Sequence, residues 1–242
     1  VTHVLYCPGS RSAPFAYALE AGSFGGDARA VLDERGAGFA AVGLARTGAL
    51  PAIVVTSGTA VAELAPAVLE ASHARLPLLL LTADRPGELR GVGASQATDQ
   101  SGFFGAQVRA SIDLEPQEAS PSLVGRLARA VAAACGAPSG APGPVQINVA
   151  FRDPLTPVGP ACDCGAEAGA SFVPRPPLVL RAPAVPERWE DVVGPAAAGL
   201  IVAGEGASPR AREWSRASSF PLLAEPASGA WKDGGVTPFE QS

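Results

Sequence analysis

The sequence is poor in the residues that metal sites, disulfide scaffolds and membrane spans require. It has four cysteines and two histidines in 242 residues, and no cysteine pair has the C-x-x-C spacing of a structural zinc site. The longest apolar run, 76–81, is too short to span a bilayer, and no signal peptide is visible. These absences predict a cytoplasmic protein with no membrane insertion and with no metal ligands among its own residues.

Lysine and methionine are also scarce. Lys232 is the single lysine among 18 basic residues, methionine is absent, and the net charge is −5. The negative charge argues against a nucleic-acid surface. Arginine forms bidentate contacts with carboxylates and phosphates, although a compositional bias of the genome would give the same excess. Because position 1 is not methionine and no closing element ends the chain, we expect a piece of a longer protein.

What the sequence does contain is an alternation of strand and helix signals over the first 150 residues. The hydrophobic fraction of 47% predicts a sizeable core. The predicted strands, each apolar on both faces as buried parallel strands are, are His3–Cys7, Ala28–Leu32, Ala52–Thr56, Leu78–Thr82, Ala110–Leu114 and Val145–Val149. The predicted helices are Ala13–Ala21, Glu34–Thr47, Ala60–Ala74, a short one near Ser101–Gly105, and Ser120–Cys135. This order predicts an α/β fold with a doubly wound, six-stranded parallel sheet and helices on both faces.

A change in composition divides the chain. Residues 1–152 form the predicted α/β domain, and 153–184, rich in Pro, Gly and Ala, read as a linker. Residues 185–242 then show strand and helix signals again, so they predict part of a second, incomplete α/β domain.

The turn Pro8–Ser12 follows the first predicted strand and opens a helix. Gly9 permits a tight turn, and Arg11 offers a fork for a carboxylate or phosphate. In the alternative interpretation the turn is only a helix start, with Ser12 as the N-cap and Arg11 solvated.

Glu34 is placed just beyond the second predicted strand, at the edge of the sheet where ligands bind. A carboxylate turned into an apolar cleft there can do proton chemistry with a ligand. In the alternative, Asp33 caps the following helix and Glu34 only favours its positive end.

Two further strand ends carry polar residues. Thr56–Ala60 is a hydroxyl-rich turn suited to an anion or a polar ring, and Asp84–Gln100 is a long polar loop typical of binding. Asp84–Arg85 or Glu88–Arg90 could instead be simple surface pairs. His73 is expected to complement a helix dipole rather than to take part in catalysis.

Together these segments, in order and spacing, resemble the MenD family, the 2-succinyl-5-enolpyruvyl-6-hydroxy-3-cyclohexene-1-carboxylate synthases. The segments that carry the resemblance are Pro8–Ser12, Asp33–Phe39, Thr56–Ala60, Leu81–Pro86, Gly93–Gln96, Pro142–Val145 and Leu222–Pro226. The resemblance implies a thiamin-diphosphate enzyme in which this chain is the pyrimidine-binding domain, 1–152, plus part of the central domain. A C-terminal domain, absent from this chain, would bind the diphosphate and Mg²⁺.

The resemblance also implies roles for residues. Glu34 matches the catalytic glutamate that hydrogen-bonds the cofactor's pyrimidine, and Thr59 and Pro8 match cofactor-side positions. The positions expected to hold substrate are Ser10, Arg11, Arg85, Ser95 and Gln96. Ser95 stands where the family usually has asparagine.

The activity implied is a decarboxylating carboligation in menaquinone biosynthesis. The enzyme, a transferase, would add the succinyl-semialdehyde unit of 2-oxoglutarate to isochorismate, and it would form a homodimer or homotetramer through its pyrimidine-binding domain. The alternatives are another thiamin-diphosphate enzyme, such as an acetolactate-synthase-like decarboxylase, or a catalytically inert binding module.

Overall fold

The computed structural model describes residues 1–22, 24–117, 120–137, 140–157 and 198–231. The chain divides into two compact units, Val1–Arg181 and Ala182–Ser242. Most of the predicted linker, from residue 158 onward, and Cys162 and Cys164 lie outside the described residues.

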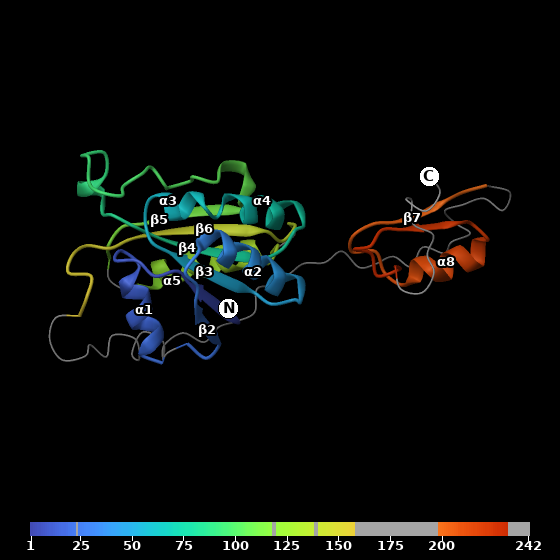
Figure 1. The fold of residues 1–242 in the computed structure, drawn as a ribbon, viewed down its shortest axis with the longest axis horizontal. Helices are drawn as coiled ribbons and strands as arrows, with labels where there is room; N and C mark the ends of the chain where they lie inside the picture. Colours follow the sequence, from blue (N-terminus) through green and yellow to red (C-terminus); the bar gives the residue numbers. More distant parts are fainter. Residues whose placement is uncertain (23, 118–119, 138–139, 158–197, 232–242) are drawn as a thin grey trace. The chain divides into compact units, whose positions relative to one another are not determined.

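The first unit contains a six-stranded parallel sheet with the strand order β2-β1-β3-β4-β6-β5 (Figure 1). Its strands are β1 (His3–Tyr6), β2 (Asp27–Ala30), β3 (Pro51–Val55), β4 (Leu78–Asp84), β5 (Ala110–Leu114) and β6 (Pro144–Ala150). Its helices are α1 (Ala13–Glu20), α2 (Glu34–Arg46), α3 (Thr59–Ala62), α4 (Ala65–His73) and α5 (Pro121–Ala134), with single 3₁₀ turns at Gly87–Leu89 and Gly105–Gln107. The predicted doubly wound α/β fold is confirmed.

Helices cover both faces of this sheet, and each face has its own core. Side chains from α2, α3 and α4 pack with Ile53 and Leu80 on one face, and side chains from α1 and α5 pack with Val54 and Val145 on the other. Each of these four strand residues is essentially buried, and burying such a side chain stabilises the fold by roughly 1.5–3 kcal/mol.

Three details of the predicted elements are wrong. The strand predicted at Ala28–Leu32 is an exposed edge strand, β2, and β5 at the other edge is only partly buried, because an edge strand has a sheet neighbour on one side only. The single helix predicted over Ala60–Ala74 is two helices, with Pro66 in the first turn of the second; proline favours that position. The short helix expected near Ser101–Gly105 is instead the 3₁₀ turn Gly105–Gln107.

The chain changes direction between β1 and β3. β1 and β3 are neighbours, but the chain leaves β1 toward α1 on one face and leaves β3 toward α3 on the other. The loops after the two strands therefore diverge, and in open α/β sheets ligands bind in the crevice that opens at such a point.

The second unit has its own small parallel sheet, formed by β7 (Ile201–Ala203) and β8 (Leu222–Ala224) on either side of α8 (Arg210–Ser218) in the sequence. Its apolar contacts gather around Ala203, Ala211, Ala224 and Ala230. The expected strand–helix–strand pattern after the linker is thus confirmed for the part that the structure describes.

Candidate functional site

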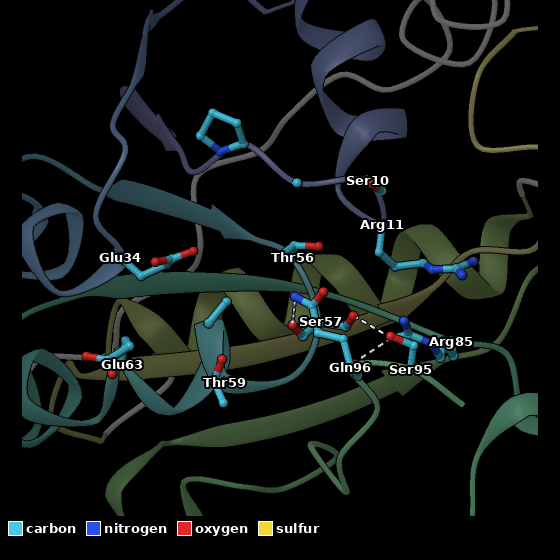
Figure 2. A pocket seen from close by; sticks show the side chains of 13 residues that line it. Ser10, Arg11, Glu34, Thr56, Ser57, Thr59, Glu63, Arg85, Ser95 and Gln96 are labelled. Carbon is cyan, nitrogen blue, oxygen red and sulfur yellow. Dashed lines mark hydrogen bonds between the residues drawn. The ribbon is translucent and has the colours of Figure 1, made fainter. Parts of the chain in front are cut away.

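A cavity of about 570 Å³ opens beside the carboxyl ends of β1 and β3 (Figure 2). All eight of the residues predicted for the site line it. The full lining is Pro8, Gly9, Ser10, Arg11, Glu34, Thr56, Ser57, Thr59, Ala60, Glu63, Arg85, Ser95 and Gln96. Five different segments of the chain contribute, so the cavity is a product of the fold and not of one local motif.

The turn after β1 is held close to the turn after β3. A Cβ atom on Gly9 would lie within 2.7 Å of three side-chain atoms of Thr56, so only glycine allows the two turns to approach this closely. Ser12 is the N-cap residue of α1, as the alternative interpretation expected, but its side chain makes no capping hydrogen bond. The residue is fully buried, and its hydroxyl donates to the Gly9 carbonyl at 3.1 Å and the Cys7 carbonyl at 3.3 Å. Ser12 therefore stabilises the turn that presents Ser10 and Arg11.

The alternative interpretation of this turn required a solvated Arg11, but the Arg11 side chain is mostly buried. Its side chain is 11% exposed and lies 3.7 Å from the Asp153 carboxylate, and its Nη1 donates to the Phe151 carbonyl at 2.8 Å. Among the described residues, the buried Nε of Arg11 is left without a hydrogen-bond partner. A buried guanidinium nitrogen without an acceptor costs free energy, and a ligand carboxylate in the cavity would supply that acceptor.

Arg85 follows β4 and lines the same cavity. Its Nη1 donates to the Ser57 hydroxyl and to the Gln96 carbonyl, each at 2.6 Å, and its backbone N–H donates to Asp84. Partial burial and the nearby positive charge of Arg11 lower the pKa of Arg85. Because two guanidinium groups repel each other in one cavity, an anionic ligand between them would stabilise both.

Ser57, Gly58 and Gln96 form an interlocked wall between the arginines and Thr59. Gly58 has a φ of +80°, and a Cβ there would lie 2.8 Å from Cγ of Gln96. Gln96 also adopts a positive φ, +53°, and its Nε2 donates to the Ser57 carbonyl at 2.9 Å. A non-glycine residue keeps a left-handed backbone only where its surroundings hold it in place. The contacts with Ser57 and Gly58 therefore fix the conformation of Gln96.

Glu34 is the first residue of α2 and reaches the cavity from the side of β2. Asp33 caps the helix through a 2.5 Å hydrogen bond from the Gly36 N–H to its carboxylate, which confirms that part of the alternative reading. The same structure also brings Glu34 into the cavity, so capping by Asp33 leaves the Glu34 carboxylate available. The lining here is largely polar rather than the apolar cleft expected around Glu34.

The negative charge of Glu34 affects the pKa of a buried thiol, that of Cys7. Cys7 is fully buried at the end of β1, and burial raises its pKa to about 12, with further contributions from the negative charges of Glu34 and Asp33. The thiol is therefore protonated and unreactive at neutral pH.

Neither surface pair considered as an alternative, Asp84–Arg85 or Glu88–Arg90, is an ion pair between side chains in the described residues. Asp84, the last residue of β4, belongs instead to a partly buried network, and Glu88 to an exposed pair. Asp84 is almost fully buried and lies 3.2 Å from Arg90, which also binds Asp113 at 2.7 Å. Asn148 donates to both carboxylates. Glu88 pairs instead with Arg152, at 2.6 Å.

Sequence reasoning did not single out five of the lining residues as site residues, namely Gly9, Thr56, Ser57, Ala60 and Glu63. Four of them lie in turns that the sequence flagged for their glycine and hydroxyl content. Glu63 carried a weaker signal, because it is four residues after Thr59 and so follows it by about one helical turn.

In the described parts of the chain, three or more His, Cys, Asp or Glu side chains do not gather in a group that could hold a metal ion. No helix in the described ranges is long and apolar enough to cross a membrane.

The sequence of this chain matches one family model and many known proteins. The family model "Thiamine pyrophosphate enzyme, N-terminal TPP binding domain" matches residues 1–103. Proteins named 2-succinyl-5-enolpyruvyl-6-hydroxy-3-cyclohexene-1-carboxylate synthase match along the chain. The one from Arthrobacter sp. is 45% identical over 95% of this chain and 38% of its own length.

Two other relatives with the same name have similar identity and coverage. The protein from Kineococcus radiotolerans is 47% identical over 94% of this chain and 41% of its own length, and that from Paenarthrobacter aurescens is 44% identical over 95% and 40%. The chain thus spans about two fifths of the length of the curated relatives that it matches. These matches do not favour the acetolactate-synthase-like alternative.

Proposed function

The chain belongs to the N-terminal portion of the 2-succinyl-5-enolpyruvyl-6-hydroxy-3-cyclohexene-1-carboxylate synthase (MenD) family, and on this premise we propose that it forms half of the active site of a thiamin-diphosphate-dependent carboligase. The complete enzyme is a transferase that joins the decarboxylated 2-oxoglutarate unit to isochorismate in menaquinone biosynthesis. The observation that carries the proposal is the separation of charge within the cavity. Glu34 and Glu63 lie toward one end of it, and Arg11 and Arg85 lie toward the other (Figure 2).

The acidic end fits the aminopyrimidine of thiamin diphosphate. A carboxylate can accept a hydrogen bond from a protonated ring nitrogen, and Glu34 enters the cavity from the N-terminus of a capped helix that holds its backbone in place. Pro8 and Thr59, from the turns after β1 and β3, are the neighbouring cofactor-side residues. Thiamin diphosphate supplies the carbon nucleophile and the electron sink for decarboxylation, and the protein orients and tunes it.

The basic end fits the carboxylates of the two substrates. Arg11 and Arg85 offer planar guanidinium forks, which match carboxylates in a bidentate manner. Arg11 retains a buried Nε that lacks a partner within the described residues, and this orphaned donor supports an anionic occupant. Ser10, Ser95 and Gln96 border the same end and supply shorter-range polar contacts.

For the whole protein, we propose a pyrimidine-binding domain at 1–152, a linker at 153–184 and part of the central domain at 185–242. The diphosphate and Mg²⁺ would be held by a further domain that this chain does not contain. The enzyme would act in the cytoplasm as a homo-oligomer associating through the pyrimidine-binding domain.

The test is a substrate assay on the complete gene product with thiamin diphosphate and Mg²⁺. We expect carbon dioxide release and a coupled product only when 2-oxoglutarate and isochorismate are both present, with the product identified by mass spectrometry. Efficient turnover of pyruvate in their place would overturn the substrate assignment. Calorimetry that detects no thiamin diphosphate binding to the complete protein would overturn the cofactor assignment and favour an inert module.

A further inference from the structure

Gln100 lies in a layer of buried polar side chains next to the cavity wall. It is 1% exposed although it belongs to a loop, where amide side chains normally face water. Its Oε1 accepts a hydrogen bond from the Gly58 N–H at 3.2 Å, and its Nε2 donates to the Ala83 carbonyl at 2.9 Å and to Asn148 Oδ1 at 2.8 Å. One amide thus ties the turn after β3 to β4 and β6.

The turn that Gln100 holds is the one on which the cavity wall depends. Gly58 packs directly against Gln96, and Arg85 donates to both Ser57 and Gln96 through the same Nη1. A shift of the Gly58 backbone would therefore displace the Ser57 hydroxyl, relax the left-handed Gln96 and remove the acceptors that aim Arg85. Gln100 itself is not among the residues that line the cavity.

Resting on the proposed function for the identity of the ligands, we propose that Gln100 is a positioning residue of this site. By fixing the Gly58 amide, it holds Ser57, Gln96 and Arg85 in the arrangement that receives the substrate carboxylates. Removing its amide leaves the Gly58 N–H without its acceptor in a buried place. The turn can then recover a hydrogen bond only by moving toward water.

The chain offers a matched control in Gln146. This residue is also a glutamine, is 0% exposed and belongs to the same network. Its Nε2 donates to the backbone carbonyl of Gln100 at 2.7 Å and its Oε1 accepts from Ser111 at 3.2 Å. Gln146→Met therefore leaves in place the side-chain amide of Gln100 and the hydrogen bond that it accepts from the Gly58 N–H. A general loss of core stability would affect Gln100→Met and Gln146→Met alike, whereas a positioning role would separate them.

The experiment compares these two variants in the complete gene product with two readouts. Hydrogen exchange of a peptide spanning 56–61 should accelerate in Gln100→Met and stay close to wild type in Gln146→Met. The KM for 2-oxoglutarate or isochorismate should rise about tenfold to 100-fold in Gln100→Met, because small misplacements of binding groups have effects of that order. It should change by less than about threefold in Gln146→Met.

Equal behaviour of the two variants in both readouts would overturn the proposal. If Gln100→Met does not fold, Gln100→Leu takes its place, since it is another apolar residue of similar size that lacks the oxygen accepting from Gly58. A rapidly exchanging 56–61 peptide with a raised KM supports the role, whereas a rapidly exchanging peptide with an unchanged KM contradicts it. A wild-type protein inactive toward both substrates would refute the proposed function, but the exchange readout would still decide the positioning role.

Discussion

The two ends of the cavity differ in how firmly the protein holds them. At the basic end, Arg85 is fixed by Ser57, Gln96 and the Asp84 carboxylate, and Arg11 by the Phe151 carbonyl. At the acidic end, neither Glu34 nor Glu63 forms an ion pair or a side-chain hydrogen bond with another described residue. The basic end is therefore preorganised, while the acidic end keeps its acceptors free for donors that a ligand brings.

This difference follows from the chemistry of the two ends. Two guanidinium groups close together repel each other, so each needs protein acceptors before an anionic ligand arrives. At the acidic end Glu34 is half-buried and Glu63 is exposed, so both carboxylates stay hydrated without such help. Preorganised groups also lose less entropy on binding, which suits the carboxylate ligands proposed for this end.

The largest effect is expected at the acidic end, from Glu34→Gln. The amide keeps the shape but loses the charge that would hold a protonated ring nitrogen, so turnover of the complete enzyme should fall by about 10²-fold to 10⁴-fold. Stability should change by less than about 1 kcal/mol, the size of a helix-dipole contribution. Steady-state kinetics and thermal denaturation measure the two quantities.

The paired variant Glu63→Gln sharpens this comparison. Glu63 is exposed and lines the same end, so it should retain most of the activity if one carboxylate carries the proton chemistry. Equal losses in the two variants would mean that the acidic end works as a patch of negative charge. An unchanged rate in Glu34→Gln would remove Glu34 from the mechanism.

A smaller effect is expected at the basic end, from Arg11→Ala. Loss of a charge-assisted hydrogen bond should raise the KM of a carboxylate substrate about tenfold to 100-fold, while the affinity for thiamin diphosphate stays largely unchanged. Arg29→Ala is a matched control, because Arg29 is an exposed arginine whose ion-pair partner is Asp27 on β2. Equal substrate affinity in Arg11→Ala and wild type would count against the role of Arg11.

The hydrogen-bond network that contains Asp113 should make the free energy of unfolding depend on pH. Burial raises the pKa of Asp113, but hydrogen bonds from Arg90 and Asn148 outweigh burial and hold this pKa below its ordinary value of 3.8. The folded state therefore gains stability from Asp113 above that value, and the gain is lost as the pH falls through the folded-state pKa. Asp113→Asn should flatten the acid limb of a denaturation profile measured from pH 6 to about pH 2.

Wild-type and Asp113→Asn curves that stay parallel down to the lowest pH would show that Asp113 contributes no such gain. Asp27→Asn provides the comparison, because Asp27 pairs with Arg29 at the exposed edge strand. An exposed pair of this kind contributes little, so its curve should follow that of the wild type.

The smallest effect concerns Cys7 beside the acidic end. Its thiol pKa, raised to about 12 by burial and by Glu34 and Asp33, should make alkylation by iodoacetamide at pH 8 very slow in the folded protein. Glu34→Gln removes one of these charges, so slow alkylation of Cys7 should become slightly faster without a change in fold. Mass spectrometry of the peptide that contains Cys7 measures this, and rapid labelling of the wild type would contradict the buried position.

Much of this architecture was accessible from the sequence. The central strands are continuous apolar runs, so β3 and β4 could be placed within two residues at either end, and Pro14 and Gly48 mark helix ends as expected. The edge strands could not be distinguished from central ones, since exposure depends on sheet order and not on the local pattern. Likewise, Pro66 signalled a helix start that the apolar pattern around it concealed.

The sequence predicted eight of the 13 residues that line the cavity, but not the contacts between them. Each predicted residue follows a strand or begins a helix, so the sheet edge brings them together. The partners of Arg11, Arg90 and Gln100 come from segments up to 140 residues away in sequence, and no local spacing reveals such contacts. Two features became visible only in three dimensions: the Nε of Arg11, which has no hydrogen-bond partner in the part of the chain that the structure describes, and the burial of Gln100 in a loop.

The most direct test of this division of labour measures thiamin diphosphate affinity and substrate KM separately in Glu34→Gln and Arg11→Ala of the complete gene product. The account predicts that Glu34→Gln lowers kcat and alters cofactor binding while the substrate KM stays within about threefold of wild type. It predicts the reverse for Arg11→Ala, with a raised substrate KM and an unchanged cofactor affinity. If both variants shift both quantities together, the two ends of the cavity do not serve different ligands, and the account is wrong.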